Sequence, residues 1–154
     1  MIFRLIVFLV LNFGALALGG LFTSKGVTSD WYYNLKIAPW TPPGWVFGFA
    51  WTTIMFCFSF YMAYLIAKVE NRRFLISIYI FQWILNVAWN PVFFYFHQIG
   101  LGLVVIVALT VLVGYFLFKY LPLIKVWSLW IAPYFIWLLI ATSLNVYLYL
   151  YNGI

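Results

Sequence analysis

The chain has 154 residues, of which 68% are hydrophobic and only 6% are charged. This composition excludes a soluble globular domain, because too few polar residues remain to cover an apolar core of this size. The formal net charge is +6, but the basic residues occur singly or in short groups beside apolar runs. That placement is typical of the flanks of membrane helices and argues against nucleic-acid binding.

Five apolar stretches are each long enough for a membrane helix, which needs about 20 residues. They are predicted at Ile2–Phe22, Gly44–Ala67, Phe74–Phe96, Ile99–Phe118 and Leu123–Tyr151. The stretches lack the alternation of apolar and polar residues that marks the strands of a membrane barrel. The predicted fold class is therefore an all-α integral membrane protein, with a five-transmembrane-helix bundle that forms one domain in contact with the lipid bilayer.

The basic residues are distributed unequally between the two ends of the predicted bundle. One end carries Arg4, Lys68, Arg72, Arg73, Lys119 and Lys125, whereas the other carries only Lys25 and Lys36. Positive residues accumulate on the cytoplasmic side of membrane proteins. The N-terminus is therefore predicted to be cytoplasmic, and the first loop and the C-terminus to lie outside.

Residues 23–43 form the longest connection between apolar stretches and are predicted to be a lid-like loop over the outer mouth of the bundle. Loops of this length in a compact domain are usually functional, and aromatic residues such as Trp31 and Tyr32 argue against a free tether. At the end of the loop, Thr41 is predicted to cap the next helix, with Pro42 in its first turn.

Three amide side chains, Gln82, Asn86 and Asn90, recur at intervals of four in the third predicted helix. This spacing places them on one helix face, which should point into the bundle because an amide against lipid is costly. Two interpretations remain open for Gln82 and Asn90, namely hydrogen bonds between helices and contact with a ligand.

The fifth predicted helix has a similar pattern, in which Trp137, Ala141 and Asn145 fall at intervals of four. A large ring beside a small residue leaves a slot on that face. Trp51 in the second helix can face the same space, and Tyr32 can close it from the loop. Such a set predicts a concave, mostly apolar pocket for a flat hydrophobic ligand.

The residues that catalysis usually needs are scarce. His97 is the only histidine and Cys57 the only cysteine, and the two acidic residues, Asp30 and Glu70, lie outside the predicted spans. Neither a hydrolytic site nor a metal site is predicted from such a set. Only Arg4 and Lys125, each near the edge of a span, place a charge within a span, so an ion pathway lacks its usual residues, although passive movement of a ligand stays an alternative.

Three motifs resemble the tryptophan-rich sensory protein and translocator protein family, also called TspO/MBR. They are the W-x-P-P-G-W-x-F-x-x-x-W run from Trp40, the L-N-x-x-W-N run from Leu85, and the P-Y-x-x-W-x-x-x-A-T-x-L-N run from Pro133. The resemblance covers nearly the whole chain. It implies a five-helix fold that is commonly a homodimer, and a cavity that opens toward the first loop. It also implies binding of porphyrins such as protoporphyrin IX and of benzodiazepine-type ligands, with no required cofactor.

Carried over position by position, the resemblance implies a ligand pocket formed by Tyr32, Trp51, Asn86, Trp89, Trp137, Ala141 and Leu144. The cholesterol motif of eukaryotic members is incomplete here. Leu144 and Tyr147 are present, but no basic residue follows Lys125. This departure argues against cholesterol binding and fits a bacterial member in the cell membrane.

We therefore expect a membrane receptor that holds a tetrapyrrole between Trp51 and Trp137, with Asn86 and Tyr32 at its polar edges and its propionates toward Lys36 or water. One alternative is light-dependent porphyrin degradation in which Trp51 and Trp137 are the redox partners. The other alternative is transport of porphyrins or similar lipophilic ligands.

Overall fold

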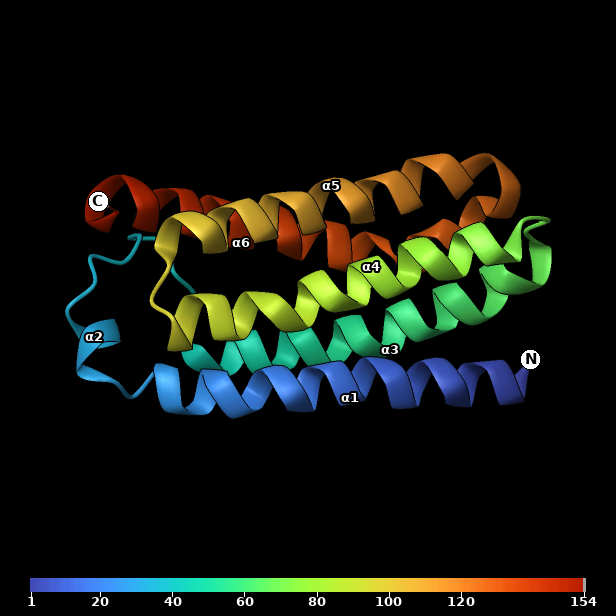
Figure 1. The fold of residues 1–154 in the computed structure, drawn as a ribbon. Coiled ribbons are helices and arrows are strands. Elements are labelled where there is room, and N and C mark those ends of the chain that lie inside the picture. Colours follow the sequence, from blue (N-terminus) through green and yellow to red (C-terminus); the bar gives the residue numbers. More distant parts are fainter. Residues whose placement is uncertain (154) are drawn as a thin grey trace.

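The computed structural model describes residues 1–153 as a bundle of long helices, with no strand in that range (Figure 1). The elements in chain order are α1 (Ile2–Gly26), α2 (Asp30–Tyr33), α3 (Gly44–Lys68), α4 (Arg72–Asn90), η1 (Pro91–Tyr95), α5 (Ile99–Ile124), η2 (Lys125–Trp130) and α6 (Ala132–Asn152). Five helical stretches are long and apolar enough to cross a membrane. The chain is therefore an all-α integral membrane protein, which confirms the predicted fold class.

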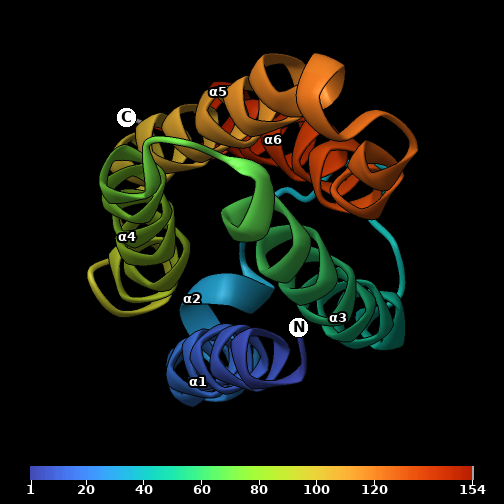
Figure 2. The same ribbon diagram turned by 90° about the vertical axis from the view of Figure 1, so that its right-hand side faces the viewer.

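The long helices surround a common interior, as the end-on view of Figure 2 shows. Helix α1 contacts α3 and α4, α5 contacts α4 and α6, and α6 in turn contacts α3. The two termini lie at opposite ends of the bundle, and the loop that contains α2 lies at the same end as the C-terminus (Figure 1). We call this end the loop end of the bundle.

The first span and the last two differ in their bounds from those predicted. Helix α1 continues past Phe22 to Gly26, so the connection predicted at residues 23–43 comprises residues 27–43. The fourth span is predicted to end at Phe118, but α5 continues through Lys119 to Ile124. Lys119 is exposed, and a long basic side chain can reach the headgroup region while its helix continues. The chain then turns through the 3₁₀ element η2, so that α6 begins at Ala132 rather than at Leu123.

The third predicted span, residues 74–96, comprises most of α4 and the π-helical turn η1. Pro91 is the first residue of η1. Because proline has no backbone N–H, the regular hydrogen-bond pattern of the α-helix cannot continue unchanged there, and a wider turn replaces it. As a result Phe93 and Phe94, which are adjacent in sequence, are both buried.

The predicted cap of the second long helix is wrong. The Thr41 hydroxyl donates to the carbonyl of Ala38 at 2.7 Å, and α3 starts at Gly44 with Pro43 as its N-cap residue and without a side-chain cap. A residue that precedes proline is disfavoured in the helical conformation, which keeps Pro42 extended. The Pro-Pro pair therefore moves the helix start beyond the reach of Thr41.

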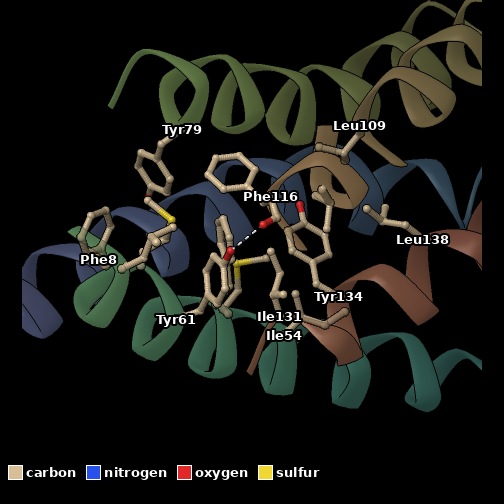
Figure 3. Close-up of a cluster of buried hydrophobic side chains, with 14 of the residues drawn as sticks. Phe8, Ile54, Tyr61, Tyr79, Leu109, Phe116, Ile131, Tyr134 and Leu138 are labelled. Carbon is tan, nitrogen blue, oxygen red and sulfur yellow. Dashed lines mark hydrogen bonds between the residues drawn. The ribbon is translucent and has the colours of Figure 1, made fainter. Parts of the chain in front are cut away.

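Large apolar side chains fill the end of the bundle opposite the loop end (Figure 3). Phe58 packs edge-on against Tyr134, with ring centroids 5.3 Å apart. The Tyr61 hydroxyl donates to the carbonyl of Phe116 at 2.8 Å and thereby joins α3 to α5. All four residues are fully buried. This half of the bundle is solid.

A small polar cluster ties α1, α3 and α4 together. The Asn12 amide donates to the Ser59 hydroxyl at 2.9 Å and accepts a hydrogen bond from the Tyr79 hydroxyl at 2.8 Å. The Ser59 hydroxyl donates to the carbonyl of Met55 at 2.6 Å. Within a bilayer such bonds between helices hold a bundle together where the hydrophobic effect between helices is weak.

Replacement of Asn12 by alanine should destabilise the protein by about 1–2 kcal/mol, because two buried hydrogen-bond partners on α3 and α4 lose their bonds. Thermal unfolding of the purified protein in detergent measures the loss. The matched control is Ser24→Ala, which removes an exposed hydroxyl from the same helix. Equal stability of the two variants would contradict a structural role for Asn12.

Candidate ligand-binding site

A cavity of about 600 Å³ lies in the loop-end half of the bundle. Its walls come from four long helices, from η1 and from the loop of residues 27–43. The residues that contribute most are Ala15, Gly19 and Thr23 of α1, Phe47 and Trp51 of α3, Asn86, Trp89 and Asn90 of α4, Phe93 and Phe94 of η1, and Leu144, Asn145 and Leu148 of α6. Among the described residues that line it, none carries a formal charge at neutral pH, so the cavity suits an uncharged ring system.

Five of the seven predicted site residues line this cavity, namely Tyr32, Trp51, Asn86, Trp89 and Leu144. The other two, Trp137 and Ala141, are buried in α6 outside the lining. Trp137 packs edge-on against Phe47, with ring centroids 5.3 Å apart, and Phe47 is the residue that faces the cavity. Trp137 therefore lies at the level of the cavity but behind Phe47, whose ring separates it from the cavity.

Asn86 differs from the other amides of its helix. Its side chain is only 9% exposed and lines the cavity. Within residues 1–153 the Asn86 amide has no hydrogen-bond partner, because only its backbone carbonyl accepts a bond, from Asn90. A buried amide without a partner is costly unless a ligand or water supplies one. Asn86 therefore offers a free donor and a free acceptor to whatever occupies the cavity.

The two neighbouring amides on α4 are engaged in contacts between helices. The Gln82 amide donates to the Tyr134 hydroxyl at 2.8 Å and lies in the solid half of the bundle. The side-chain amide oxygen of Asn90 accepts a bond from the Thr23 hydroxyl at 2.7 Å, which joins α4 to α1. Of the two interpretations that the sequence leaves open, hydrogen bonding between helices describes Gln82 and Asn90, although Asn90 also borders the cavity.

An aromatic wall stands opposite α3. The Trp89 ring stacks on Phe93 at 5.0 Å with an interplanar angle of 9°, and it meets Phe94 edge-on at 5.7 Å. The Trp89 N–H donates to the side-chain amide oxygen of Asn145 at 3.2 Å. The side-chain NH2 of Asn145 donates in turn to the backbone carbonyl of Ala141 at 2.9 Å. These bonds hold the indole plane in one orientation.

The loop of residues 27–43 lies across the loop end of the cavity and is held at the η1 side by stacked rings. Trp31 stacks on His97 at 4.2 Å and meets Phe93 edge-on at 5.4 Å. Tyr32 packs against Phe94 at 5.8 Å and lines the cavity. Burial raises the pKa of the Tyr32 hydroxyl, so this group remains a protonated donor at neutral pH.

The other side of the loop is attached to α6. The Asn152 amide accepts a bond from the backbone N–H of Lys36 at 2.8 Å and donates to its carbonyl at 3.0 Å. The Trp40 N–H donates to the Ser143 hydroxyl at 3.1 Å. The loop is thus fastened to η1, to the start of α5 and to α6, and it forms a roof over the cavity.

Several residues in the cavity wall or directly behind it were not predicted from the sequence. At Gly19 an added Cβ would lie 2.5 Å from the Asn90 amide nitrogen, and at Gly26 it would collide with the Phe94 ring. These glycines bring α1 close to α4 and η1. Together with Thr23 they form one face of α1 at helical spacing, and this series of small residues is the signal in the sequence that indicates a close contact.

Replacement of Asn152 by alanine should expose the loop to proteolysis, because both hydrogen bonds to Lys36 are lost. We expect trypsin to cleave after Lys36 about fivefold faster or more, since the population of open loop rises with each lost bond. Mass spectrometry of timed digests measures the rate at this site. Asn34→Ala removes an exposed amide bonded within α2 and is the control. Equal rates for the two variants would show that Asn152 does not hold the loop.

The TspO/MBR family model matches residues 6–150 of the chain. The tryptophan-rich sensory protein of Cereibacter sphaeroides is 33% identical over 75% of this chain and 73% of its own length. A tryptophan-rich protein TspO of Archaeoglobus fulgidus is 32% identical over 88% of each chain, and the human translocator protein is 30% identical over 75% of this chain and 70% of its own. The matched region contains all five membrane helices, and the chain belongs to the TspO/MBR family.

Proposed function

We propose that this protein is a receptor, in a bacterial cell membrane, for tetrapyrroles such as protoporphyrin IX and for other flat hydrophobic molecules. The observation that carries the proposal is the unpartnered amide of Asn86 inside a mostly apolar cavity of about 600 Å³. Ligand sites are typically concave and mostly apolar, enclose about 300–1,000 Å³ and carry few polar groups. Size, lining and the free amide all fit this description.

In this proposal the macrocycle lies between Trp51 on one side and the wall formed by Trp89 and Phe93 on the other. Aromatic surfaces favour stacked or edge-on contact with a flat ring system. The Asn86 amide can donate to an unprotonated ring nitrogen or accept from a pyrrole N–H. Lys36, which is exposed next to the lining residue Ile37, is a charge that propionate groups could approach. Trp137 would act on the ligand through Phe47 rather than by direct contact.

Replacement of Asn86 by leucine should weaken binding of protoporphyrin IX about three- to tenfold, which is the net value of one neutral hydrogen bond. Leucine keeps the volume of the side chain but offers no polar group. The measurement is a titration in darkness that follows quenching of tryptophan fluorescence. Pyrene, which is flat but has no polar atom, should bind the variant at least as well as the wild type.

Ser77→Ala is the control for this titration, because it removes an exposed hydroxyl from the same helix. It should bind both ligands as the wild type does. If Asn86→Leu also binds protoporphyrin IX with unchanged affinity, the amide has no part in recognition. If the wild type does not bind protoporphyrin IX at all, the proposed ligand class is wrong.

Light-driven oxidation of the bound porphyrin is a second candidate function, favoured by the position of Trp51. This indole lines the cavity, and its ring meets the Tyr134 ring edge-on at 5.9 Å. A photoexcited porphyrin can take one electron from a neighbouring indole, and the reduced macrocycle can then add dioxygen. The electron returns to the oxidised indole as the macrocycle opens, so that both oxygen atoms end on the porphyrin and dioxygen is the oxidant. Tyr134 is the next residue that could share the positive charge of the indole before the electron returns.

Under illumination, Trp51→Phe should bleach bound protoporphyrin IX at least about tenfold more slowly than the wild type, because loss of the nearest electron donor raises the barrier of the first step. Trp137→Phe should have a smaller effect, because Phe47 separates this indole from the cavity. Absorbance at saturating protein gives the rate, and the dark titration shows that each variant still binds. Bleaching at the wild-type rate in Trp51→Phe would exclude Trp51 as the donor.

A further inference from the structure

We propose that ligands enter the cavity sideways from the membrane, through an opening between α1 and α3, and not through the loop that covers the cavity. This inference rests on the proposed function, since it concerns the route to the same cavity. The opening is formed by Gly20 of α1, by Gly44 and Gly48 of α3, and by Ile37 of the loop. We call it the side mouth.

The exposure of the lining residues locates this opening. Among the residues that line the cavity, only Gly20, Ile37, Gly44 and Gly48 are exposed within residues 1–153, and the others are buried or half-buried. A residue that both lines a cavity and is exposed marks a place where the cavity reaches the surface. All four lie on α1, on α3 or in the loop between them. The lining residues of α4 and α6 are buried or half-buried.

The glycines of the side mouth are not required by close packing. A Cβ added at Gly20, Gly44 or Gly48 would meet no atom within 4 Å. At Gly19 and Gly26, by contrast, a Cβ would collide with Asn90 and Phe94. Glycine is less favourable than alanine within a helix, so its presence at Gly20 and Gly48 has no local structural advantage. What these glycines provide is an open gap between two helices.

Further from the loop end than the side mouth, helices α1 and α3 are in direct contact and leave no opening between them. Asn12 of α1 donates to Ser59 of α3, and the rings of Phe13 and Phe56 meet edge-on at 4.9 Å. The two helices run in opposite directions, so that Gly20 lies about 12 Å along α1 from Asn12 on the side of the loop end, and Gly48 lies about 16 Å along α3 from Ser59 in the same direction. The two glycines therefore lie within about one turn of each other in depth.

Exposed aromatic residues place the side mouth at the boundary between headgroups and acyl chains. Trp45, between Gly44 and Gly48, is 73% exposed, and Phe49 is 67% exposed. Exposed tryptophan of this kind collects at membrane interfaces. A molecule with a flat apolar body and one polar edge accumulates at the same level for the same reason. The class of ligand that this route admits is therefore a flat amphiphile dissolved in the leaflet at the loop end.

The loop blocks a direct route from water into the cavity. The loop is held in place by the two hydrogen bonds between Lys36 and Asn152 and by the stack of Trp31 on His97. At the side mouth, by contrast, no side chain projects from the three glycine positions, so a ligand can pass without breaking a hydrogen bond of the loop.

The test measures the rate constants of binding of protoporphyrin IX to the protein in lipid nanodiscs by stopped-flow tryptophan fluorescence. In Gly20→Leu and Gly48→Leu a side chain enters open space at the side mouth, so folding should be preserved. Association and dissociation should both slow by roughly tenfold, because one barrier governs both directions.

Gly14→Leu is the matched control, because a Cβ at Gly14 also meets no atom within 4 Å but Gly14 does not line the cavity. Its rate constants should equal those of the wild type. Asn152→Ala, which loosens the loop, should likewise leave both rate constants unchanged. Faster binding in Asn152→Ala, or wild-type rates in both Gly20→Leu and Gly48→Leu, would overturn the side route while the receptor function stands. Absence of binding to the wild type would overturn both proposals.

Discussion

The structure depends on one constraint, which is that a polar side chain inside a bilayer needs a hydrogen-bond partner, since no water is available to replace it. The three amides of α4 meet this constraint differently. Gln82 bonds to Tyr134 of α6 and Asn90 to Thr23 of α1, so that each ties α4 to another helix. Asn86 lies between them on the same face and finds no such partner within residues 1–153. Helix α4 is therefore bonded to other helices one turn before and one turn after Asn86, and Asn86 itself faces the cavity.

The bundle is consequently divided along its length into a solid half and a hollow half. In the solid half, the rings of Phe58, Tyr61 and Tyr134 fill the interior completely. In the hollow half, the π-helical turn at Pro91 directs two consecutive rings, Phe93 and Phe94, into the cavity wall. Turns of this type are rare and frequently occur at functional sites. The cavity is therefore bounded by rigid elements on the α4 side and by the loop at its end.

Much of this arrangement follows from the sequence, because helical spacing defines which face of a helix points inward. Asn86 on α4 and Asn145 on α6 belong to faces that were predicted in this way, and both line the cavity, whereas Leu144 was implied only by the family resemblance. Spacing gives the angle of a residue about the helix axis but not which neighbouring side chains stand between it and a cavity. Trp137 and Ala141 share the inward face of α6, yet they lie outside the lining, and for Trp137 the side chain in between is Phe47 of α3.

Local backbone chemistry explains the other differences. The cap expected at Thr41 fails because two consecutive prolines delay the start of α3. The extension of α5 past Lys119 reflects the length of a lysine side chain, which lets a charge sit at the edge of the bilayer without ending the helix. Each of these effects depends on neighbours that a pattern of apolar residues does not describe.

Helix α1 shows most clearly why the sequence alone could not resolve the site. Gly19 and Gly20 are adjacent and chemically identical, but they point about 100° apart around the helix. Gly19 is in close contact with Asn90, whereas a Cβ at Gly20 would meet nothing. One glycine therefore closes the wall of the cavity and its neighbour opens it to the lipid. Composition assigns both to helix packing, and only the positions of α3 and α4 around α1 separate the contact from the opening.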